Sequence, residues 1–325
     1  MQAIVAESTE QLVWRDVPDV SPDQGEILIK VAAAGLNRAD LLQAAGHYPP
    51  PPGASQTLGM ECSGTVAALG GGIEGFSVGQ EVCALLAGGG YAEYVAVPAG
   101  QVMPIPSGVS LVDAAGLPEV ACTVWSNLVM TAHLAAGQVL LIHGGASGIG
   151  THGIQVANAL GSRVAVTAGS EAKLELCREL GADIAINYND EDFVERIRKE
   201  TDGAGADVIF DIMGASYLDR NLDALALDGQ LVVIGMQGGL KGELNIGKLI
   251  GKRTRVIGTA LRGRPIDGPM SKSAIVDAVV DNVWPMIADG RVRPITGAVF
   301  PIEQAAEAHR LLSSGKVTGK VLLTV

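Results

Sequence analysis

Short apolar runs separated by glycine and proline occupy the first third of the chain. They predict strands at residues 3–6, 26–33, 62–69, 81–86 and 91–97. Short strands at this spacing are typical of a compact, barrel-like β domain. Between them, residues 35–55 combine a short helical piece with a proline-rich loop, which is either a plain surface loop or a place where the scaffold displays functional side chains.

From about residue 121 to 261 the pattern changes, because apolar runs alternate with helical periodicity. Strands are predicted at residues 139–142, 164–168, 184–187, 208–211, 231–235 and 255–259, after a helix over 118–135. Six strands with intervening helices predict a doubly wound parallel sheet. An amphipathic helix over 271–288 and a strand over 320–325 should then return to the β domain. We therefore expect a domain of residues 1–120 completed by 262–325, and a second domain of residues 121–261.

The turn after the first strand of the second domain carries a small-residue motif. Gly145, Ser147 and Gly150 fill the three slots of G-x-G-x-x-G, and Gly148 and Ile149 lie between them. These slots need small residues so that the chain turns tightly, approaches a pyrophosphate and packs its helix on the strand, with the helix N-terminus facing the phosphates. Such a string can also be a simple turn, but a strand before it and a helix after it favour a dinucleotide site.

The end of the next strand indicates which dinucleotide is bound. An NAD-specific site has an Asp or Glu there, roughly 20 residues after the glycines. This chain has Ala168-Gly169-Ser170 instead. Ser170 is predicted to be a helix N-cap, which places Lys173 in the first turn, where a cation is unfavourable unless an anion is near. The 2′-phosphate of NADPH is that anion, and the alternative is a solvated lysine offset by Glu171.

Composition and charge narrow the class of partner. The 325 residues contain 35 acidic and 23 basic side chains, and the net charge of −12 argues against a nucleic-acid or anionic membrane surface. The four cysteines lie far apart without C-x-x-C spacing, so they indicate neither a zinc ribbon nor a disulfide framework. With no signal peptide or membrane-spanning run evident in the sequence, we expect a soluble cytoplasmic protein with a small-molecule partner.

Several motifs spread along the chain carry a family resemblance. They are Asn37-Arg38-Ala39-Asp40, Gly46-His47-Tyr48, Pro50-Pro51-Pro52-Gly53-Ala54-Ser55, Leu117-Pro118-Glu119 and the glycine turn of residues 145–150. In these motifs and in its domain order the chain resembles the zinc-free quinone oxidoreductases of the medium-chain dehydrogenase/reductase superfamily. The resemblance implies an α/β fold, with a doubly wound parallel Rossmann sheet and a β-rich GroES-like barrel domain.

The zinc-containing branch of that superfamily offers a contrast at two positions. It would carry a cysteine ligand at Asn37 and a histidine ligand at Met60. An amide and a thioether are poor zinc ligands, and Glu61 alone cannot hold the ion. We therefore expect no metal site. Without zinc, the site has no Lewis acid to stabilise the alkoxide that forms when an alcohol is oxidised. Reduction of an acceptor that is already electrophilic is therefore favoured over oxidation of an alcohol.

The resemblance also implies roles for individual residues. A hydride would pass from NADPH C4 to a quinone or conjugated carbonyl, with Asn37, Tyr48 and Ser147 as catalytic residues. The sequence leaves the proton source open, and water could supply it. Asp40 would brace its helix or touch a ligand, Tyr48 could simply be packed, and Ser147 could be only a small turn residue. The residues implied for NADPH binding are Asn37, Thr123, Gly145, Ser147, Gly148, Ile149, Gly150, Ser170, Lys173, Tyr188, Gly214, Gly235, Met236 and Lys320.

Other classes of function compete with this one. A hydrolase would need G-x-S-x-G, and the glycine-preceded serines Ser55, Ser147 and Ser216 lack its final glycine. A non-catalytic NADPH-binding protein and a reductase of alkenals or enoyl thioesters stay open. For assembly, we expect a homodimer through the edge strand Arg255 to Thr259, unless residues 262–270 fold back over that edge.

Overall fold

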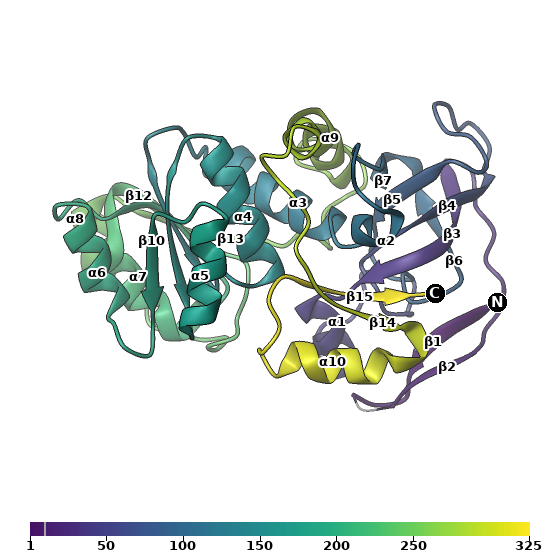
Figure 1. Ribbon diagram of the computed structural model, residues 1–325, viewed down its shortest axis with the longest axis horizontal. Helices are drawn as coiled ribbons and strands as arrows, with labels where there is room; N and C mark the ends of the chain where they lie inside the picture. Colours follow the sequence, from purple (N-terminus) through teal and green to yellow (C-terminus); the bar gives the residue numbers. More distant parts are fainter. Residues whose placement is uncertain (10) are drawn as a thin grey trace. The chain divides into compact units, whose positions relative to one another are not determined.

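The computed structural model describes residues 1–9 and 11–325 and divides into two compact units. Unit 1 comprises Met1–Cys122, Leu261–Gly290 and Pro294–Val325, and unit 2 comprises Thr123–Ala260 and Arg291–Arg293. Unit 1 therefore contains both ends of the chain. In Figure 1 its yellow C-terminal strand lies beside strands formed by the purple N-terminal part.

Unit 2 is built on a six-stranded sheet in which every strand pair is parallel. The order β10-β9-β8-β11-β12-β13 confirms the predicted doubly wound fold, because the chain starts in the middle and winds outward in both directions. The strands are β8 (Val139–His143), β9 (Arg163–Ala168), β10 (Ile184–Asn187), β11 (Ala206–Asp211), β12 (Leu225–Val233) and β13 (Arg255–Gly258).

Helices connect the strands of unit 2. Apolar strand residues such as Leu141 and Ile209 are fully buried, as expected for a parallel sheet covered on both faces. The helices are α4 (Gly148–Ala159), α5 (Glu171–Glu179), α6 (Phe193–Glu200), α7 (Leu218–Ala224) and α8 (Ile246–Lys252), with the short 3-10 turn η3 (Gly214–Tyr217) before α7.

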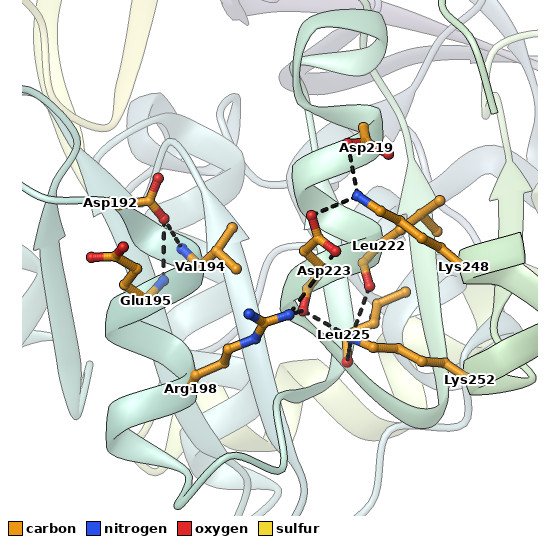
Figure 2. Close-up of polar contacts among 10 residues, drawn as sticks. All are labelled: Asp192, Val194, Glu195, Arg198, Asp219, Leu222, Asp223, Leu225, Lys248 and Lys252. Atoms are coloured by element: carbon orange, nitrogen blue, oxygen red, sulfur yellow. Dashed lines mark hydrogen bonds and ion pairs between the residues drawn. The ribbon is translucent and has the colours of Figure 1, made fainter. Parts of the chain in front are cut away.

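Charged side chains tie α6, α7 and α8 together (Figure 2). The Lys252 ammonium donates to three carbonyl oxygens at the end of α7, those of Leu222, Asp223 and Leu225, at 2.9, 2.8 and 2.5 Å. From α6, Arg198 donates to the Asp223 carbonyl at 3.1 Å. These bonds place positive charge at the carbonyl end of α7, where it is favourable.

The helix predicted over residues 118–135 changes character along its length. It starts as α3 (Pro118–Val124) and continues as the π-helix η2 (Trp125–Thr131). It ends at Thr131, four residues short of the prediction, and His133 has a φ of 54°, which a regular helix does not accommodate. The wider π turns bring the Asn127 side-chain amide to the Thr123 carbonyl at 2.8 Å.

Unit 1 contains a seven-stranded, mainly antiparallel sheet with β3 (Glu26–Gly35) near its centre. The order is β14-β15-β3-β4-β5-β7, and β6 also pairs with β3. The other strands are β4 (Glu61–Leu69), β5 (Glu81–Leu85), β6 (Tyr94–Pro98), β7 (Val102–Pro104), β14 (Thr296–Pro301) and β15 (Lys320–Thr324), with β1 (Gln2–Ala6) and β2 (Leu12–Asp16) in a separate hairpin.

Strands β2, β7 and β14 were not predicted from the sequence. The strand expected over 91–97 starts later, at Tyr94. The helices of unit 1 are α1 (Arg38–Ala44), α2 (Leu111–Ala114), α3, α9 (Lys272–Ala288) and α10 (Ala305–Ser313), with the 3-10 turns η1 (Ala99–Gln101) and η4 (Ile302–Gln304). The helix expected over 271–288 is α9, and its N-cap Ser271 accepts from the Ala274 N–H at 3.2 Å.

Among the described residues, no helix combines the length and the apolar character needed to cross a bilayer.

Candidate functional site

The glycine turn between β8 and α4 is tightly enclosed by neighbouring atoms. A Cβ atom added at Gly145 would lie 2.7 Å from the Val166 Cβ, and one at Gly150 would lie 2.4 Å from the Gly144 carbonyl oxygen. Real Cβ atoms do not approach other heavy atoms so closely, because interiors are already close-packed. Glycine at both positions therefore allows strand, turn and helix to pack as the dinucleotide motif requires.

Ser147 in the middle slot is the N-cap of α4. Its hydroxyl oxygen accepts a hydrogen bond from the Gly150 N–H at 3.0 Å. This bond satisfies one of the N–H groups that a helix leaves without intrahelical partners. The N–H groups of Gly148 and Ile149, also in the first turn, belong to the same positive end of the helix.

The polar positions after β9 have the expected arrangement. Ser170 is the N-cap of α5, although within the described chain its side chain makes no capping hydrogen bond. Lys173 is half-buried in the first turn. The Glu171 carboxylate, expected to offset that lysine if it is merely solvated, accepts from the Arg178 guanidinium at 2.6 Å.

Tyr188 covers the end of β9. A Cβ atom at Gly169 would lie 2.3 Å from the Tyr188 hydroxyl oxygen and 2.6 Å from the ring carbon that bears it. Asn189 donates to the Gly169 carbonyl at 2.9 Å, which ties the two strand ends together. Tyr188 is half exposed, so one part of its ring packs on the backbone while the rest is open.

The ends of β11 and β12 bring three predicted residues together. Gly214 has a φ of 73°, which glycine adopts without strain. A Cβ atom there would lie 3.0 Å from the Gly235 carbonyl oxygen and 3.2 Å from the Met236 Cα. Met236 is 53% exposed. Thr123, by contrast, is buried and its carbonyl oxygen accepts from Asn127 and Ser126.

In unit 1, Asn37 and Lys320 meet at a buried carboxylate. The Lys320 ammonium donates to the Leu36 carbonyl at 2.7 Å, the Asn37 amide oxygen at 2.8 Å and the Glu61 carboxylate at 2.6 Å. The Asn37 amide nitrogen donates to the same Glu61 oxygen at 2.9 Å. Glu61 is fully buried and the Lys320 side chain is 8% exposed. All three N–H donors of Lys320 are therefore engaged within the protein.

This network bears on the question of a metal. Asn37 and Glu61 are two of the three positions that were compared with zinc ligands, and both are bonded to an ammonium group. Met60, the third position, is buried with 1% exposure. Over residues 1–9 and 11–325, no three His, Cys, Asp or Glu side chains gather as a metal site. The donor set of amide, thioether and lysine-bound carboxylate does not suit zinc.

Asp40 braces the start of α1. Its two carboxylate oxygens accept from the Asn37 N–H at 2.8 Å and from the Gly59 N–H at 3.0 Å. Burial raises the pKa of the Asp40 carboxyl to about 6, although both hydrogen bonds act in the opposite direction. The bracing role weighed for Asp40 is therefore present in the structure.

Tyr48 belongs to a second polar group in unit 1. The Arg262 guanidinium lies 5.3 Å from the centroid of the Tyr48 ring and donates to the Tyr48 carbonyl at 3.3 Å. It also donates to the Ala87 carbonyl at 2.8 Å and to the Gln43 amide oxygen at 2.6 Å. Burial lowers the pKa of Arg262, and the carboxyl of Glu119 is among the groups that oppose this shift.

Glu119 connects the two polar groups. Its backbone N–H, in the first turn of α3, donates to the second Glu61 oxygen at 2.9 Å. Removal from water and the charge of Glu61 raise the pKa of the Glu119 carboxyl to about 8. Reasoning from the sequence missed the contributions of Glu61, Glu119 and Arg262. The first two stand beside quoted motifs, in Met60-Glu61 and Leu117-Pro118-Glu119, whereas Arg262 carried no local signal.

Comparison with known proteins bears on both units. Residues 23–107 match the alcohol dehydrogenase GroES-like domain family and residues 148–276 match the zinc-binding dehydrogenase family. Quinone oxidoreductase of Rattus norvegicus is 30% identical over 311 residues, which are 95% of this chain and 92% of the rat protein. The chain belongs to the quinone oxidoreductase branch of the medium-chain dehydrogenase/reductase superfamily.

Two further matches show the range of the medium-chain dehydrogenase/reductase superfamily. The crystal structure of Escherichia coli quinone oxidoreductase complexed with NADPH has a TM-score of 0.89 and 27% identity, covering 100% of this chain and 99% of that one. A phenolphthiocerol/phthiocerol polyketide synthase of Mycobacterium tuberculosis is 30% identical over 305 residues. The chain covers only 14% of that polyketide synthase, although the match includes 94% of this chain. Fold and family are thereby established, and the predicted α/β fold with a GroES-like domain is confirmed.

Proposed function

We propose that this protein reduces quinones, or related conjugated carbonyl compounds, with NADPH and without zinc. The observation that carries the proposal is the Lys320 ammonium, which is bonded to Asn37, where the zinc-containing branch would have a metal ligand, and to Glu61, which follows the second such position, Met60. A lysine held this way offers no Lewis acid to an alcohol substrate. An acceptor whose carbonyl is already electrophilic needs none, which favours a quinone or a conjugated carbonyl.

The turn of unit 2 fits the pyrophosphate of the dinucleotide. The close packing at Gly145 and Gly150 leaves room for backbone only, and Ser147 is small enough for the middle slot. The N–H groups of Gly148 and Ile149 would donate to phosphate oxygens at the positive end of α4. Ser147 would thus shape the turn through its capping bond and would also meet the dinucleotide there.

The 2′-phosphate would be recognised after β9. Ser170 offers a hydroxyl that caps no helix N–H within the described chain, and Lys173 offers positive charge. The strand ends in Ala168 and not in an acidic residue. No carboxylate at that position would therefore repel the 2′-phosphate of NADPH, and none would bind the free ribose hydroxyls of NADH. The solved NADPH complex of the Escherichia coli relative supports the same choice of dinucleotide.

Asn37 and Tyr48 of unit 1 would support hydride transfer. Bound NADPH would supply the hydride from C4 of its nicotinamide. Asn37, fixed by Lys320, would turn its side-chain amide to the nicotinamide-side ribose, and Tyr48 would line the acceptor pocket. Further proposed dinucleotide contacts are Thr123 near the nicotinamide, Tyr188 on the adenine side, and Gly214, Gly235 and Met236 at strand ends.

Steady-state kinetics with a panel of acceptors tests the proposal. The panel consists of a naphthoquinone, a methylated benzoquinone, an alkenal, an enoyl thioester, and a primary alcohol with NADP⁺. We expect quinone-dependent NADPH oxidation and no alcohol oxidation. Stoichiometric NADPH binding with no turnover on any acceptor would show a non-catalytic NADPH-binding protein instead.

A second candidate acceptor is an alkenal or an enoyl thioester. The match to a polyketide synthase supports this candidate, because a sequence related to nearly all of this chain occurs as one part of that much longer protein. The same hydride donor and zinc-free site would serve it. A value of kcat/KM for the alkenal or thioester at least tenfold above that for every quinone would favour it.

We further propose a homodimer that pairs β13 edges. Among the described strands, β13 pairs with β12 alone and therefore leaves one edge unpaired. Apolar side chains are exposed nearby in sequence, with Ile250 at 71% and Val256 at 37%. Residues 262–270, the alternative cover for this edge, start at Arg262, whose side chain bonds to Gln43 and Ala87.

Light scattering tests the assembly. A mass near twice 33.3 kDa at micromolar concentration, reduced by a proline at Ile257, would support pairing through this edge. A wild-type mass near that of a single chain would contradict the dimer.

A further inference from the structure

The proposed reaction adds one hydride to the acceptor and therefore also consumes a proton. We propose, as a step that rests on the function proposed above, that Glu119 is the acid that delivers this proton to the reduced acceptor. The assignment makes Glu119 a catalytic residue, in place of the water that could supply the proton.

Position distinguishes Glu119 from the other carboxyl groups of the network. Asp40 and Glu61 are fully buried, and their oxygens accept hydrogen bonds from backbone or side-chain donors inside the protein. Glu119 lies at the start of α3, bonded to Glu61 through its backbone N–H, and remains partly exposed. Of these three residues, Glu119 is the one that keeps some exposure to solvent.

Charged and titratable groups from several elements surround Glu119. The groups that act on its carboxyl or respond to it come from α1, β4, α3, α9, β15 and the segments around 48 and 262. They are Asp40, Glu61, Cys122, Lys272, Lys320, Tyr48 and Arg262.

Within the described part of the chain, neither Lys320 nor Arg262 forms an ion pair with Glu119, although the charge of each lowers the pKa of its carboxyl. Lys320 uses its three donors on Leu36, Asn37 and Glu61. The Arg262 guanidinium donates to Ala87, Tyr48 and Gln43 at the distances given above. Glu61 acts as acceptor for Lys320, Asn37 and the Glu119 N–H, which is the behaviour of an ionised carboxylate. A fixed negative charge thus stands beside Glu119, so its carboxyl retains its proton near neutral pH.

The surroundings of Glu119 include the residue proposed to line the acceptor pocket. Burial is the main cause of the raised pKa of the Tyr48 phenol, and the charge of the Glu119 carboxyl raises it further. In the proposed step, an acceptor stacked on Tyr48 takes its proton from this carboxylic acid. A group with a pKa of about 8 suits proton donation at neutral pH, since it is protonated yet acidic enough to give the proton up.

The step balances without another reactant. Hydride attack on a quinone forms one new bond to hydrogen and leaves the hydroquinone monoanion. The Glu119 O–H bond then breaks, its proton bonds to the anionic oxygen, and Glu119 is left as a carboxylate. A proton from solvent restores the acid form before the next turnover. For a conjugated carbonyl, the enolate takes the same proton.

The first experiment compares Glu119→Gln with wild type over pH 6 to 10, using a methylated benzoquinone as acceptor. The wild-type kcat should fall as pH rises through about 8, because the acid form of Glu119 is lost. In E119Q, kcat at neutral pH should be about a hundredfold lower, near the lower end of the usual contribution of a general acid, and this pH dependence should disappear. Glu119→Asp should restore part of the rate and the pH dependence.

A change of acceptor separates proton donation from a structural role. The anion formed from a chlorinated benzoquinone is stable without immediate protonation, so E119Q should reduce this acceptor at nearly the wild-type rate. A merely misfolded site would lose both activities alike. Glu81→Gln, at an exposed position on β5, is the matched control and should leave both rates unchanged.

Infrared titration gives a readout without turnover. Wild-type protein should show a carboxylic acid band that disappears near pH 8 and is missing in E119Q. Equal pH profiles of wild type and E119Q, or loss of the profile in Tyr48→Phe but not in E119Q, would overturn the role of Glu119 alone. Wild-type protein that is inactive on every acceptor would overturn the proposed function, and this inference with it.

Discussion

Replacing Lys320 by methionine should destabilise unit 1 strongly. The substitution keeps most of the side-chain volume but removes the ammonium, which donates at 2.7, 2.8 and 2.6 Å to Leu36, Asn37 and Glu61. Glu61, with no exposure, would then be a buried carboxylate that keeps the Asn37 amide as a side-chain donor but has lost its cation. Breaking one side of a buried ion pair costs about 3 to 5 kcal/mol, equivalent to a fall in Tm of roughly 6 to 20 °C for a unit of this size.

Thermal unfolding followed by circular dichroism measures this effect. Lys316→Met, an exposed lysine just before the same strand, is the matched control and should change Tm by no more than about 1 °C. The double variant Glu61→Gln with Lys320→Met removes the stranded charge, so it should be more stable than Lys320→Met alone. If Lys320→Met has the same Tm as the control Lys316→Met, or if adding Glu61→Gln does not raise the Tm of Lys320→Met, the reasoning about this ion pair is wrong.

Two further predictions concern the proposed function. Lys173→Ala should weaken NADPH binding about tenfold or more and spare NADH, because a charge-assisted bond to the 2′-phosphate is worth about 1.5 to 3 kcal/mol. Fluorescence titration measures both affinities, and equal losses for the two dinucleotides would contradict the assignment of Lys173 to the 2′-phosphate. Activity should survive exhaustive chelation, and elemental analysis should find no stoichiometric zinc, because Asn37 and Met60 offer only an amide and a thioether. Finding one zinc per chain that is lost together with activity would contradict this prediction of a zinc-independent enzyme.

The parts of the fold that were predicted correctly depend on local sequence. The glycine turn, the strand at 184–187 and the helix over 271–288 could be recognised because each signal lies within one short stretch of sequence. Strand β14 escaped prediction because its residues, Thr296–Pro301, include glycine and proline and alternate between exposed and half-buried positions, so it forms by pairing with β15. Its character comes from a partner strand and not from its own sequence.

The polar network of unit 1 could not be predicted for a related reason. Glu61 and Lys320 are 259 positions apart in the chain, and Arg262 is 219 positions from Gln43. No periodicity or motif connects residues at such separations, so only folding reveals that they meet. Asn37 and Lys320 were singled out by resemblance, but the bond between them, and the carboxylate that both share, came from the structure.

The contact between Tyr188 and Gly169 sets a condition on how this protein could change its dinucleotide. The simplest mutation toward NADH would place an acidic side chain at the end of β9, and Gly169 is one of the positions available. Its new Cβ would meet the Tyr188 hydroxyl at 2.3 Å, so the ring would have to leave its place first. A lineage that gains the acid at this position must therefore also move or replace the tyrosine, and an engineer should test the acid with and without a smaller residue at position 188.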